Sequence, residues 1–494
     1  MKRHKILFIS TEVSPFVKTN ILADFSYQLP LALRELGHEV RVMMPKYKSI
    51  NERKFILRDV IRLKEIGIPV GDEEKKFSVK SAFLPNSKVQ IYFLDYKPYF
   101  SRNGLYINEK KKGDFSDNAN RFVLFSKGIL ETLKLLCWQP NIIHCNDWQT
   151  GLIPLYLKTI YKNDKFFCKT SSVFTIHNFH EPGCFERNLL EKAGLIDDKN
   201  YDEKCTEFNG QFSFLKAGII FSDYITTNSE NYVKQFEEIY KSLNDFTNLL
   251  KNRKDKIVNI MQGVDYSTWN PEIDKNITME YNLKTIHNKN ENKKSLLTKV
   301  GLPLKPDFLL LGWIYNKNDS EFFNVLGNVV KYLKNLNIQI VVVGKIDKKG
   351  IINLKKYKEH YSKNFSFYST DDAKFIHIII AGCDVFLLPF LFYHEDFNPI
   401  HCLNYGTVPV IRNIGEFSDM IIEFHKNSVT GNGFIIKNYS SEEIVQKLEY
   451  ISKLFQNESI WRIIQKNGMK EEFLWENNAK KYIKVYSSAL KMQK

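Results

Sequence analysis

The sequence predicts an α/β protein built from two doubly wound halves, each with a largely parallel sheet covered by helices. Two series of short apolar segments, within residues 5–177 and 307–413, alternate with segments of helical periodicity. Apolar strands separated by helices are typical of parallel sheets with both faces covered. The length of 494 residues also indicates more than one domain.

The elements of the first half follow one another in a regular order. Apolar runs predict strands at 5–10, 39–45, 89–96, 141–145 and 171–177. Helical periodicity predicts a helix at 119–136, between the third and fourth of these strands.

The second half repeats the pattern after a polar stretch near residues 285–300. Strands are predicted at 307–315, 338–345, 365–369, 383–389 and 408–413, and helices at 320–336, 372–381 and 398–405. We therefore expect an N-terminal domain at 1–264, a C-terminal domain at 265–472 and a final helix at 473–494 that packs back on the first domain. An interdomain cleft at the carboxyl ends of the strands is the expected ligand site.

Composition excludes several classes of protein. No apolar run approaches the roughly 20 residues needed to span a bilayer, and the amino terminus suits a strand better than a signal peptide, so we expect a cytoplasmic protein without a membrane partner. The net charge of +15 comes from basic residues that are spread along the chain, which favours a solvated surface over nucleic-acid binding. The seven cysteines include no C-x-x-C pair, so reduced thiols are expected and no metal site is predicted.

Polar residues gather where predicted strands end. Lys18 lies in the turn after the first strand, where a basic residue can hold a phosphate at a helix amino terminus. Asp147 follows the strand 141–145, either as a ligand for a sugar hydroxyl or as a helix cap. His177 and Asn178 end the next strand. In the second half Glu395 lies after a strand and Asn398 opens a helix whose amino terminus suits an anion.

Ordered blocks along nearly the whole chain resemble those of the glycogen and starch synthases. They include KILFISTEVSPFVKT, DNANRFVLFSKGILE, IIHCNDWQTGLIPLYLK, VFTIHN, GVDYSTWNP and LNYGTVPVIRNIG. The resemblance implies the GT-B fold, with an acceptor-side first domain and a nucleotide-sugar-side second domain. It also implies transfer of glucose, with retention, from a nucleotide sugar such as ADP-glucose to an α-1,4-glucan, without a metal or cofactor.

The resemblance also implies roles for individual residues. Asp147 matches the aspartate that contacts the transferred glucose, and His177 matches the histidine beside the glucosyl group, with Asn178 next to it. Lys18 matches the lysine near the phosphates, and Asn398 and Thr407 fall in the donor block.

Several donor positions depart from the family pattern. The glycines of the first turn are replaced by Asn20 and Ile21, and we expect strain there because those glycines favour unusual backbone angles. In an ungapped alignment the departures elsewhere are Asn316 for the clamp arginine, Glu321 for the clamp lysine, Tyr393 for a glutamate, Asp396 for a glycine and Gln262 for an asparagine. Lys317, Lys345 and Glu395 lie near enough to replace part of the lost chemistry.

Three hypotheses follow from this combination of residues that match the family pattern and residues that depart from it. The first is an active, diverged α-glucan synthase that uses ADP-glucose or UDP-glucose. The second is a non-catalytic relative that binds glucan or regulates an active synthase as its partner. The third is a transferase with a less charged donor, such as a sugar monophosphate, which would suit Glu321 and Asp396 better.

Overall fold

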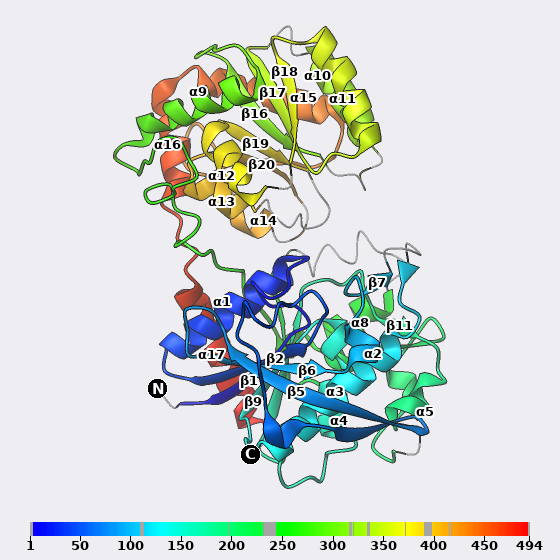
Figure 1. Cartoon of the computed structure of the whole chain (residues 1–494). Helices are drawn as coiled ribbons and strands as arrows, with labels where there is room; N and C mark the ends of the chain where they lie inside the picture. Colours follow the sequence, from blue (N-terminus) through cyan, green and yellow to red (C-terminus); the bar gives the residue numbers. More distant parts are fainter. Residues whose placement is uncertain are drawn as a thin grey trace. The chain divides into compact units, whose positions relative to one another are not determined.

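The computed structural model divides the chain into two compact units, which are coloured along the sequence in Figure 1. The first unit is Met1–Gln262 with Trp475–Lys494, and the second unit is Gly263–Leu474. The residues that the structure describes are 3–108, 113–196, 198–229, 231, 244–315, 319, 321–332, 336–370, 372–389, 398–413, 415 and 417–492.

The first unit is organised around a ten-stranded sheet in the order β15-β14-β10-β9-β1-β2-β6-β5-β3, with β4 paired to β5. Its central strands run parallel, whereas β3, β4 and β6 pair with β5 in antiparallel fashion. The strands are β1 (Lys5–Ile9), β2 (Glu39–Pro45), β3 (Arg58–Asp59), β4 (Ile66–Val70), β5 (Glu73–Phe83), β6 (Gln90–Asp95), β9 (Ile142–Asn146), β10 (Ser171–Ile176), β14 (Tyr224–Thr227) and β15 (Ile257–Asn259). Small antiparallel sheets are formed by β7 (Ile107–Asn108) with β8 (Gly113–Asp114), and by β11 (Cys184–Phe185), β12 (Glu207–Phe208) and β13 (Gln211–Ser213).

Helices connect the parallel strands of the first unit. They are α1 (Ile21–Glu35), α2 (Lys97–Phe100), α3 (Asn118–Leu135), α4 (Leu152–Lys158), α5 (Leu189–Ala193), α6 (Phe214–Phe221), α8 (Asn244–Asn252) and α17 (Trp475–Lys491). Short 3-10 turns lie at η1 (Ile61–Leu63), η2 (Trp148–Thr150), η3 (Glu203–Cys205) and η5 (Lys254–Lys256).

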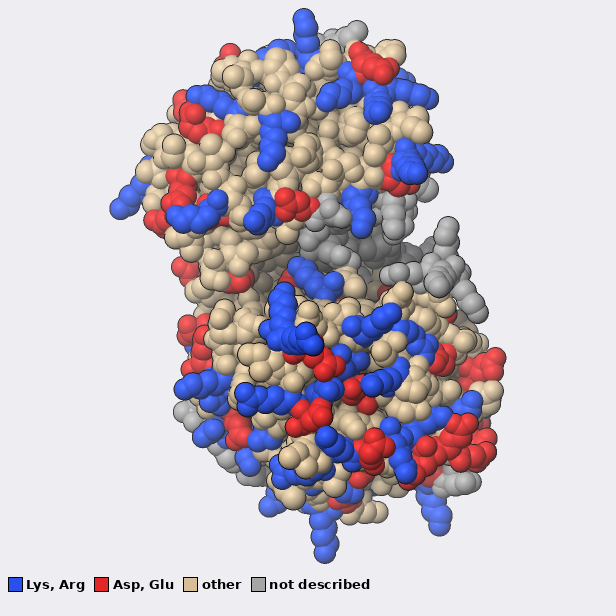
Figure 2. All heavy atoms as spheres, in the orientation of Figure 1, with Lys and Arg blue, Asp and Glu red and all other residues tan. Residues whose placement is uncertain are grey.

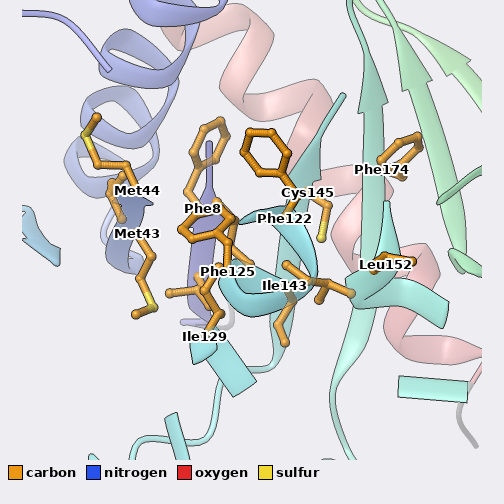
Figure 3. Packing of buried hydrophobic residues seen from close by; sticks show 14 of the residues in the cluster. Phe8, Met43, Met44, Phe122, Phe125, Ile129, Ile143, Cys145, Leu152 and Phe174 are labelled. Carbon is orange, nitrogen blue, oxygen red and sulfur yellow. The ribbon is translucent and has the colours of Figure 1, made fainter. Parts of the chain in front are cut away.

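The core of the first unit lies between the parallel strands and the helices that cover them. Figure 3 shows Phe8 of β1 and Ile143 of β9 among Phe122, Phe125 and other apolar side chains. All four of these side chains are fully or almost fully buried. Since the strands are apolar on both faces, they are stable only when helices cover both sides, which explains the alternation in the sequence.

Helix α17, at the end of the chain, is part of the first unit. Trp475, Tyr482 and Tyr486 are buried in its core, and the helix contacts α1 and β10. The Tyr486 hydroxyl lies 2.7 Å from Nδ1 of His144, whose Nε2 lies 2.6 Å from the Thr175 hydroxyl. A buried polar chain therefore joins α17 to the two strands that end at Asn146 and Ile176.

The second unit is a six-stranded, fully parallel sheet in the order β18-β17-β16-β19-β20-β21. Its strands are β16 (Leu309–Ile314), β17 (Ile338–Gly344), β18 (Phe365–Ser369), β19 (Val385–Leu388), β20 (Val408–Arg412) and β21 (Phe434–Ile436). Its helices are η6 (Ile286–Asn288), α9 (Lys289–Val300), α10 (Phe322–Tyr332), α11 (Lys348–His360), α12 (Ala373–Gly382), α13 (Pro399–Asn404), α14 (Phe417–Met420), α15 (Ser441–Phe455) and α16 (Glu458–Met469).

Local sequence signals explain where several of these helices begin. The Ser440 side chain caps α15 by accepting a hydrogen bond from the Glu443 amide at 3.2 Å. The Glu443 carboxylate in turn accepts the amides of Lys437 and Asn438 at 2.6 and 2.8 Å. The Ser440 cap satisfies one amide that the helix itself leaves without a partner, and Glu443 fixes the segment that leads into the helix.

The two sheets confirm the predicted α/β class with two doubly wound halves. Figure 2 shows Lys and Arg side chains interspersed with Asp and Glu over the visible face of each unit, in keeping with the spread of basic residues along the sequence. Within the described ranges, no helix combines the length and the apolar character needed to cross a bilayer.

Candidate functional site

The carboxyl edge of the first unit's sheet brings together polar residues from four strands. The strand order reverses between β1 and β9, and doubly wound sheets bind ligands outside such a reversal. The parallel register pairs Ile9 with Cys145 and Asn146 with Thr175, so neighbouring strands end at the same level. The residues that follow the ends of β1, β9, β10 and β14 are Glu12, Asp147, His177 and Asn228, respectively.

Asp147 lies in the turn after β9 and is 8% exposed. Its backbone has a φ of 56°, a conformation that aspartate tolerates better than most residues. One carboxylate oxygen, Oδ1, accepts the amides of His177 and Asn178 at 2.7 and 3.3 Å. In the part of the chain that the structure describes, no donor contacts the other oxygen, Oδ2. Asp147 is therefore fixed by one oxygen and can offer the second to a ligand.

Burial controls the protonation of Asp147. It raises the pKa of this carboxyl to about 7, against the effect of the two amides, and the charges of Glu181 and Glu12 add to the rise. Near neutral pH the carboxyl is therefore divided between its acid and its ionised form.

The imidazole of His177 is held by two asparagine amides. The Asn146 amide nitrogen donates to the Ile9 carbonyl at 2.8 Å, which leaves its oxygen to accept from Nε2 of His177 at 3.0 Å. Nδ1 of His177 then accepts from the Asn228 amide at 3.2 Å. Burial lowers the pKa of this imidazole to about 3, so the ring is neutral, with its proton on Nε2. This geometry suits positioning and hydrogen bonding better than general base catalysis.

Glu12, which follows β1, also belongs to this site, although it was not predicted from the sequence. It is fully buried, and its carboxylate accepts hydrogen bonds from the Thr19 amide, the Thr19 hydroxyl, the Asn20 side chain and the Tyr106 hydroxyl at 2.6–3.1 Å. Burial raises the pKa of Glu12, although these donors oppose the rise. The only signal in the sequence was its place just after a strand, because Tyr106 lies 94 positions away.

The turn that carries Lys18 is occupied by its own side chains. Nζ of Lys18 lies 2.8 Å from the carboxylate of Asp24 in the first turn of α1. Asn20 is the N-cap of α1, and its side-chain oxygen accepts the Leu22 amide at 2.8 Å. The Thr19 amide is bound to Glu12. Within the described part of the chain, two amides and one cation that could face a phosphate are therefore already paired.

The expected backbone strain at Asn20 and Ile21 is wrong. Asn20 is extended, with a φ of −155°, and Ile21 is the first residue of the right-handed helix α1. Neither residue is among those with positive φ. Any non-glycine residue adopts these conformations, so the replacement of the glycines changes which side chains fill the turn and does not strain it.

The second unit contains the remaining predicted site residues. Asn398 caps α13, and its side chain accepts the Ile400 amide at 2.9 Å. Thr407 is 1% exposed. Its hydroxyl accepts a hydrogen bond from Nζ of Lys289 at 2.6 Å and also contacts the carbonyls of Ile380 and Cys383. Lys317 and Glu395, and the departures at 316, 393 and 396, lie outside the described residues. Lys345 is exposed directly after β17.

Acidic residues follow β16, at the reversal of strand order in the second unit. Glu321 is exposed, and its amide donates to the Asp319 carboxylate at 3.0 Å. Burial raises the pKa of the nearby Tyr439 phenol, and Asp319 and Glu321 raise it further, whereas Arg412 lowers it. Arg412 ends β20, and among the described residues no hydrogen-bond acceptor contacts its buried Nε. It is a cation that the sequence interpretation did not single out.

Comparison with known proteins identifies the class. The family model described as the starch synthase catalytic domain matches residues 5–251, and that described as glycosyl transferases group 1 matches residues 315–468. The chain is similar to the solved structure of the catalytic domain of starch synthase IV from Arabidopsis thaliana bound to ADP and acarbose. The TM-score is 0.83 and the identity 22%, over 99% of this chain and 100% of that chain. The fold is therefore that of the GT-B glycosyltransferases, as the sequence predicted.

Full-length relatives define the family. The glycogen synthases of Pelodictyon phaeoclathratiforme and Chlorobaculum tepidum are 35% and 36% identical to the chain over 489 residues, which are 99% of each protein. The glycogen synthase of Thermosipho melanesiensis is 34% identical over 98% of this chain and 99% of its own. The chain thus belongs to the glycogen and starch synthase family.

Proposed function

We propose that the protein transfers glucose from a nucleotide sugar, ADP-glucose in the first instance, to an α-1,4-glucan with retention of configuration. The observation that carries this proposal is the arrangement of Asp147, held by two amides through Oδ1 with Oδ2 available. The names of the full-length relatives support the same activity. The cytoplasm remains the proposed location.

Asp147 and His177 are the proposed catalytic residues of the first unit, which we assign to the acceptor side. Glycosyl transfer passes through a transition state with positive charge on the sugar ring. The ionised form of Asp147 would stabilise that charge through Oδ2. The neutral ring of His177 is fixed by Asn146 and Asn228, so it would position the glucosyl group without exchanging a proton.

Lys18 and Asn178 of the first unit are proposed as donor-binding residues, as the family resemblance implies. A diphosphate leaving group requires positive groups and backbone amides that stabilise its growing charge. Asn398 and Thr407 of the second unit keep the donor-binding roles that the family resemblance implies. Lys317 is proposed as a further donor-binding residue, and Glu395 as a catalytic residue in place of the glutamate replaced by Tyr393. Arg412 is an added proposal, because its buried Nε has no acceptor among the described residues.

A second function is favoured by the side-chain contacts within the turn that carries Lys18, which is named here the phosphate-binding turn. Lys18 is paired with Asp24, the Leu22 amide is capped by Asn20, and the exposed Glu321 replaces a clamp lysine. Loss of one preorganised donor costs about 10²–10³ in rate, so several losses together would abolish transfer. In this alternative the protein does not catalyse transfer, and it binds glucan or regulates an active synthase as its partner.

One experiment separates the two functions. Purified protein and a Lys18→Ala variant are given radiolabelled ADP-glucose or UDP-glucose with glycogen, and glycogen binding is measured in parallel by affinity gel electrophoresis. Transfer that is lost in the variant supports the enzyme. Glycogen retardation without any transfer supports the non-catalytic binder. A protein that neither transfers glucose nor binds glycogen contradicts both.

A further inference from the structure

Glu181 is a third carboxylate close to Asp147, and neither the sequence interpretation nor the proposed mechanism uses it. It lies in the loop between β10 and β11, at the same carboxyl edge of the sheet. One oxygen lies 3.4 Å from Nε1 of Trp148, and the other lies 3.4 Å from the side-chain amide of Asn178. The backbone amide of Asn178 also donates to Asp147, so Asn178 contacts both the Asp147 and the Glu181 carboxylates.

Glu181 differs from the other two carboxylates in its accessibility. Glu12 and Asp147 are buried, and Glu12 already accepts four donors, whereas Glu181 is exposed. A carboxylate has about four acceptor positions, and the two long hydrogen bonds of Glu181 leave positions that can accept from a ligand.

The loop that carries Glu181 is fixed to the body of the first unit. The carbonyl of Pro182 accepts from the Leu215 amide at 3.2 Å and from the Ser213 hydroxyl at 2.8 Å, and the Gly183 carbonyl accepts from the Phe214 amide at 3.0 Å. Gly183 has a φ of +57°, and a Cβ there would lie 2.6 Å from the Trp148 ring. The carboxylate is therefore presented from a well-anchored turn, as a binding residue needs to be.

The local charge indicates what kind of ligand fits. Glu12 and Glu181 are both close enough to Asp147 for their charges to act on it. No Lys, Arg or His side chain in the described part of the chain forms an ion pair with any of these three carboxylates, so an anionic group gains no paired cation beside Glu181. The donor phosphates are assigned to Lys18, in the turn after β1. The three carboxylates also do not form a cluster suited to a metal ion among the described residues. A neutral, hydroxyl-rich ligand fits best, because hydroxyls donate to carboxylates and accept from the Asn178 amide.

We propose that Glu181 binds hydroxyl groups of the acceptor glucan at the entrance to the Asp147–His177 site. This assignment rests on the proposed glucan specificity and adds a binding residue to it. Loss of a hydrogen bond to a charged group weakens binding by roughly one to two orders of magnitude. We therefore expect Glu181→Ala to weaken maltoheptaose binding by about tenfold or more, and Glu181→Gln to have an intermediate effect because the amide oxygen still accepts.

The test measures maltoheptaose affinity by isothermal titration calorimetry for the wild type, Glu181→Ala, Glu181→Gln and Glu186→Ala. Glu186 is the control, because it is also an exposed carboxylate of this segment and contacts only Asn188 among the described side chains. Thermal melting verifies that each variant is folded, and the isosteric Gln variant gives a result even if the Ala variant is unstable.

The outcomes separate this inference from the proposed function. Weaker binding by the Glu181 variants, with wild-type affinity in Glu186→Ala, supports it. Equal affinity in all four proteins overturns the role of Glu181 and leaves the proposed function intact. A wild type that does not bind maltoheptaose overturns the proposed glucan specificity, and with it the ligand assigned to Glu181.

Discussion

Asp147 is the residue in which local structure and chemistry are most closely joined. Its positive φ turns the chain sharply after β9, and the same turn places one carboxylate oxygen against the first two amides beyond β10. Burial raises its pKa to about 7, so the carboxyl is only partly ionised near neutral pH. A buried carboxyl without an ion pair carries a cost in stability, as expected of a functional residue.

The pH dependence of unfolding tests this account of Asp147. The usual pKa of aspartate is about 3.9, so between pH 4 and pH 7 the folded state keeps a proton that the unfolded state releases. The resulting stabilisation is complete below about pH 4 and is lost as the pH rises through 7, on the order of 4 kcal/mol in total. We expect denaturant titrations from pH 4 to 8 to show this loss in the wild type and not in Asp147→Asn.

The matched control for this titration is Asp72→Asn, which changes an exposed aspartate in the turn between β4 and β5. Its free energy of unfolding should follow the wild type at every pH. Parallel curves for the wild type and Asp147→Asn would contradict the raised pKa.

Asn20 determines how the phosphate-binding turn is filled. In Asn20→Gly the Leu22 amide loses its side-chain acceptor and becomes available to a phosphate. We expect ADP to bind about five- to tenfold more tightly, which corresponds to roughly one added hydrogen bond. Glycine is an acceptable N-cap, but the substitution also removes the Asn20 amide that donates to the buried Glu12 carboxylate, so we expect a loss of about 1–3 kcal/mol in stability.

Calorimetric titration with ADP measures this change, and Asn51→Gly is the control. The Asn51 side chain also accepts backbone amides, from Arg53 and Lys54, but it lies in an exposed loop outside the site. Unchanged ADP affinity in Asn20→Gly would mean that the Asn20 side chain does not limit donor binding.

At the scale of elements, α17 supports the strands that carry the site. Its Tyr486 binds His144 of β9, His144 binds Thr175 of β10, and the Thr175 carbonyl accepts the Asp147 amide at 3.0 Å. Burial lowers the pKa of His144 well below its usual value, so this link is made by a neutral ring. The end of the chain therefore stabilises the strand ends on which Asp147 and His177 depend.

Tyr486→Phe tests this link. It removes the partner of Nδ1 of His144 and leaves a buried polar atom unsatisfied, so the free energy of unfolding should fall by about 1–3 kcal/mol. Denaturant unfolding of the purified protein measures the loss. Tyr450→Phe in α15 is the control. Tyr450 is 39% exposed, so loss of its hydroxyl should change the free energy of unfolding little. Equal stability of both variants would show that the hydrogen bond to His144 contributes nothing.

The sequence allowed most parallel strands of both units to be predicted, because continuous apolar runs such as those of β1, β9 and β17 have few alternatives. The short parallel strands β14, β15 and β21 near the sheet edges were not predicted. The antiparallel strands β3, β4 and β5 were not predicted. The segment EEKKFSVKSAF of β5 is rich in charge, and it becomes a strand through its pairing with the apolar strand β6. Tertiary context therefore overrides the local pattern at this edge.

The site was predictable only in part for a similar reason. Asp147 and His177 directly follow strongly apolar strands, so their position at the sheet edge could be inferred. Glu12 gains its environment from Tyr106, far away in the sequence, and the occupation of the phosphate-binding turn depends on side-chain orientations of Lys18 and Asn20. Contacts between residues far apart in the sequence, and the orientations of side chains, cannot be predicted from the spacing of residues along the chain.

At the scale of the whole molecule, each unit has its own core, and only the first unit is built from two separate stretches of chain. Truncation after Leu474 removes Trp475, Tyr482 and Tyr486 from the first unit's core. We expect the first unit to lose cooperative folding while the second unit stays folded, because its own core, from Leu309 to Ile464, is unchanged.

Limited proteolysis with mass spectrometry measures this difference by the segments that resist cleavage. A truncation after Met492, which removes only the last two residues, is the control and should resist cleavage like the full chain. Equal protection of both units in the protein truncated after Leu474 would contradict the role assigned to α17.

The carboxyl edge of the first unit's sheet is proposed as a site of glucosyl transfer centred on Asp147. The most direct test compares the rate of glucose transfer from ADP-glucose to glycogen in the wild type, Asp147→Asn and Asp72→Asn. We expect measurable transfer by the wild type and Asp72→Asn, and a rate at least about 100-fold lower in Asp147→Asn with glycogen binding retained. Equal rates in the wild type and Asp147→Asn, or no transfer by the wild type, would contradict it.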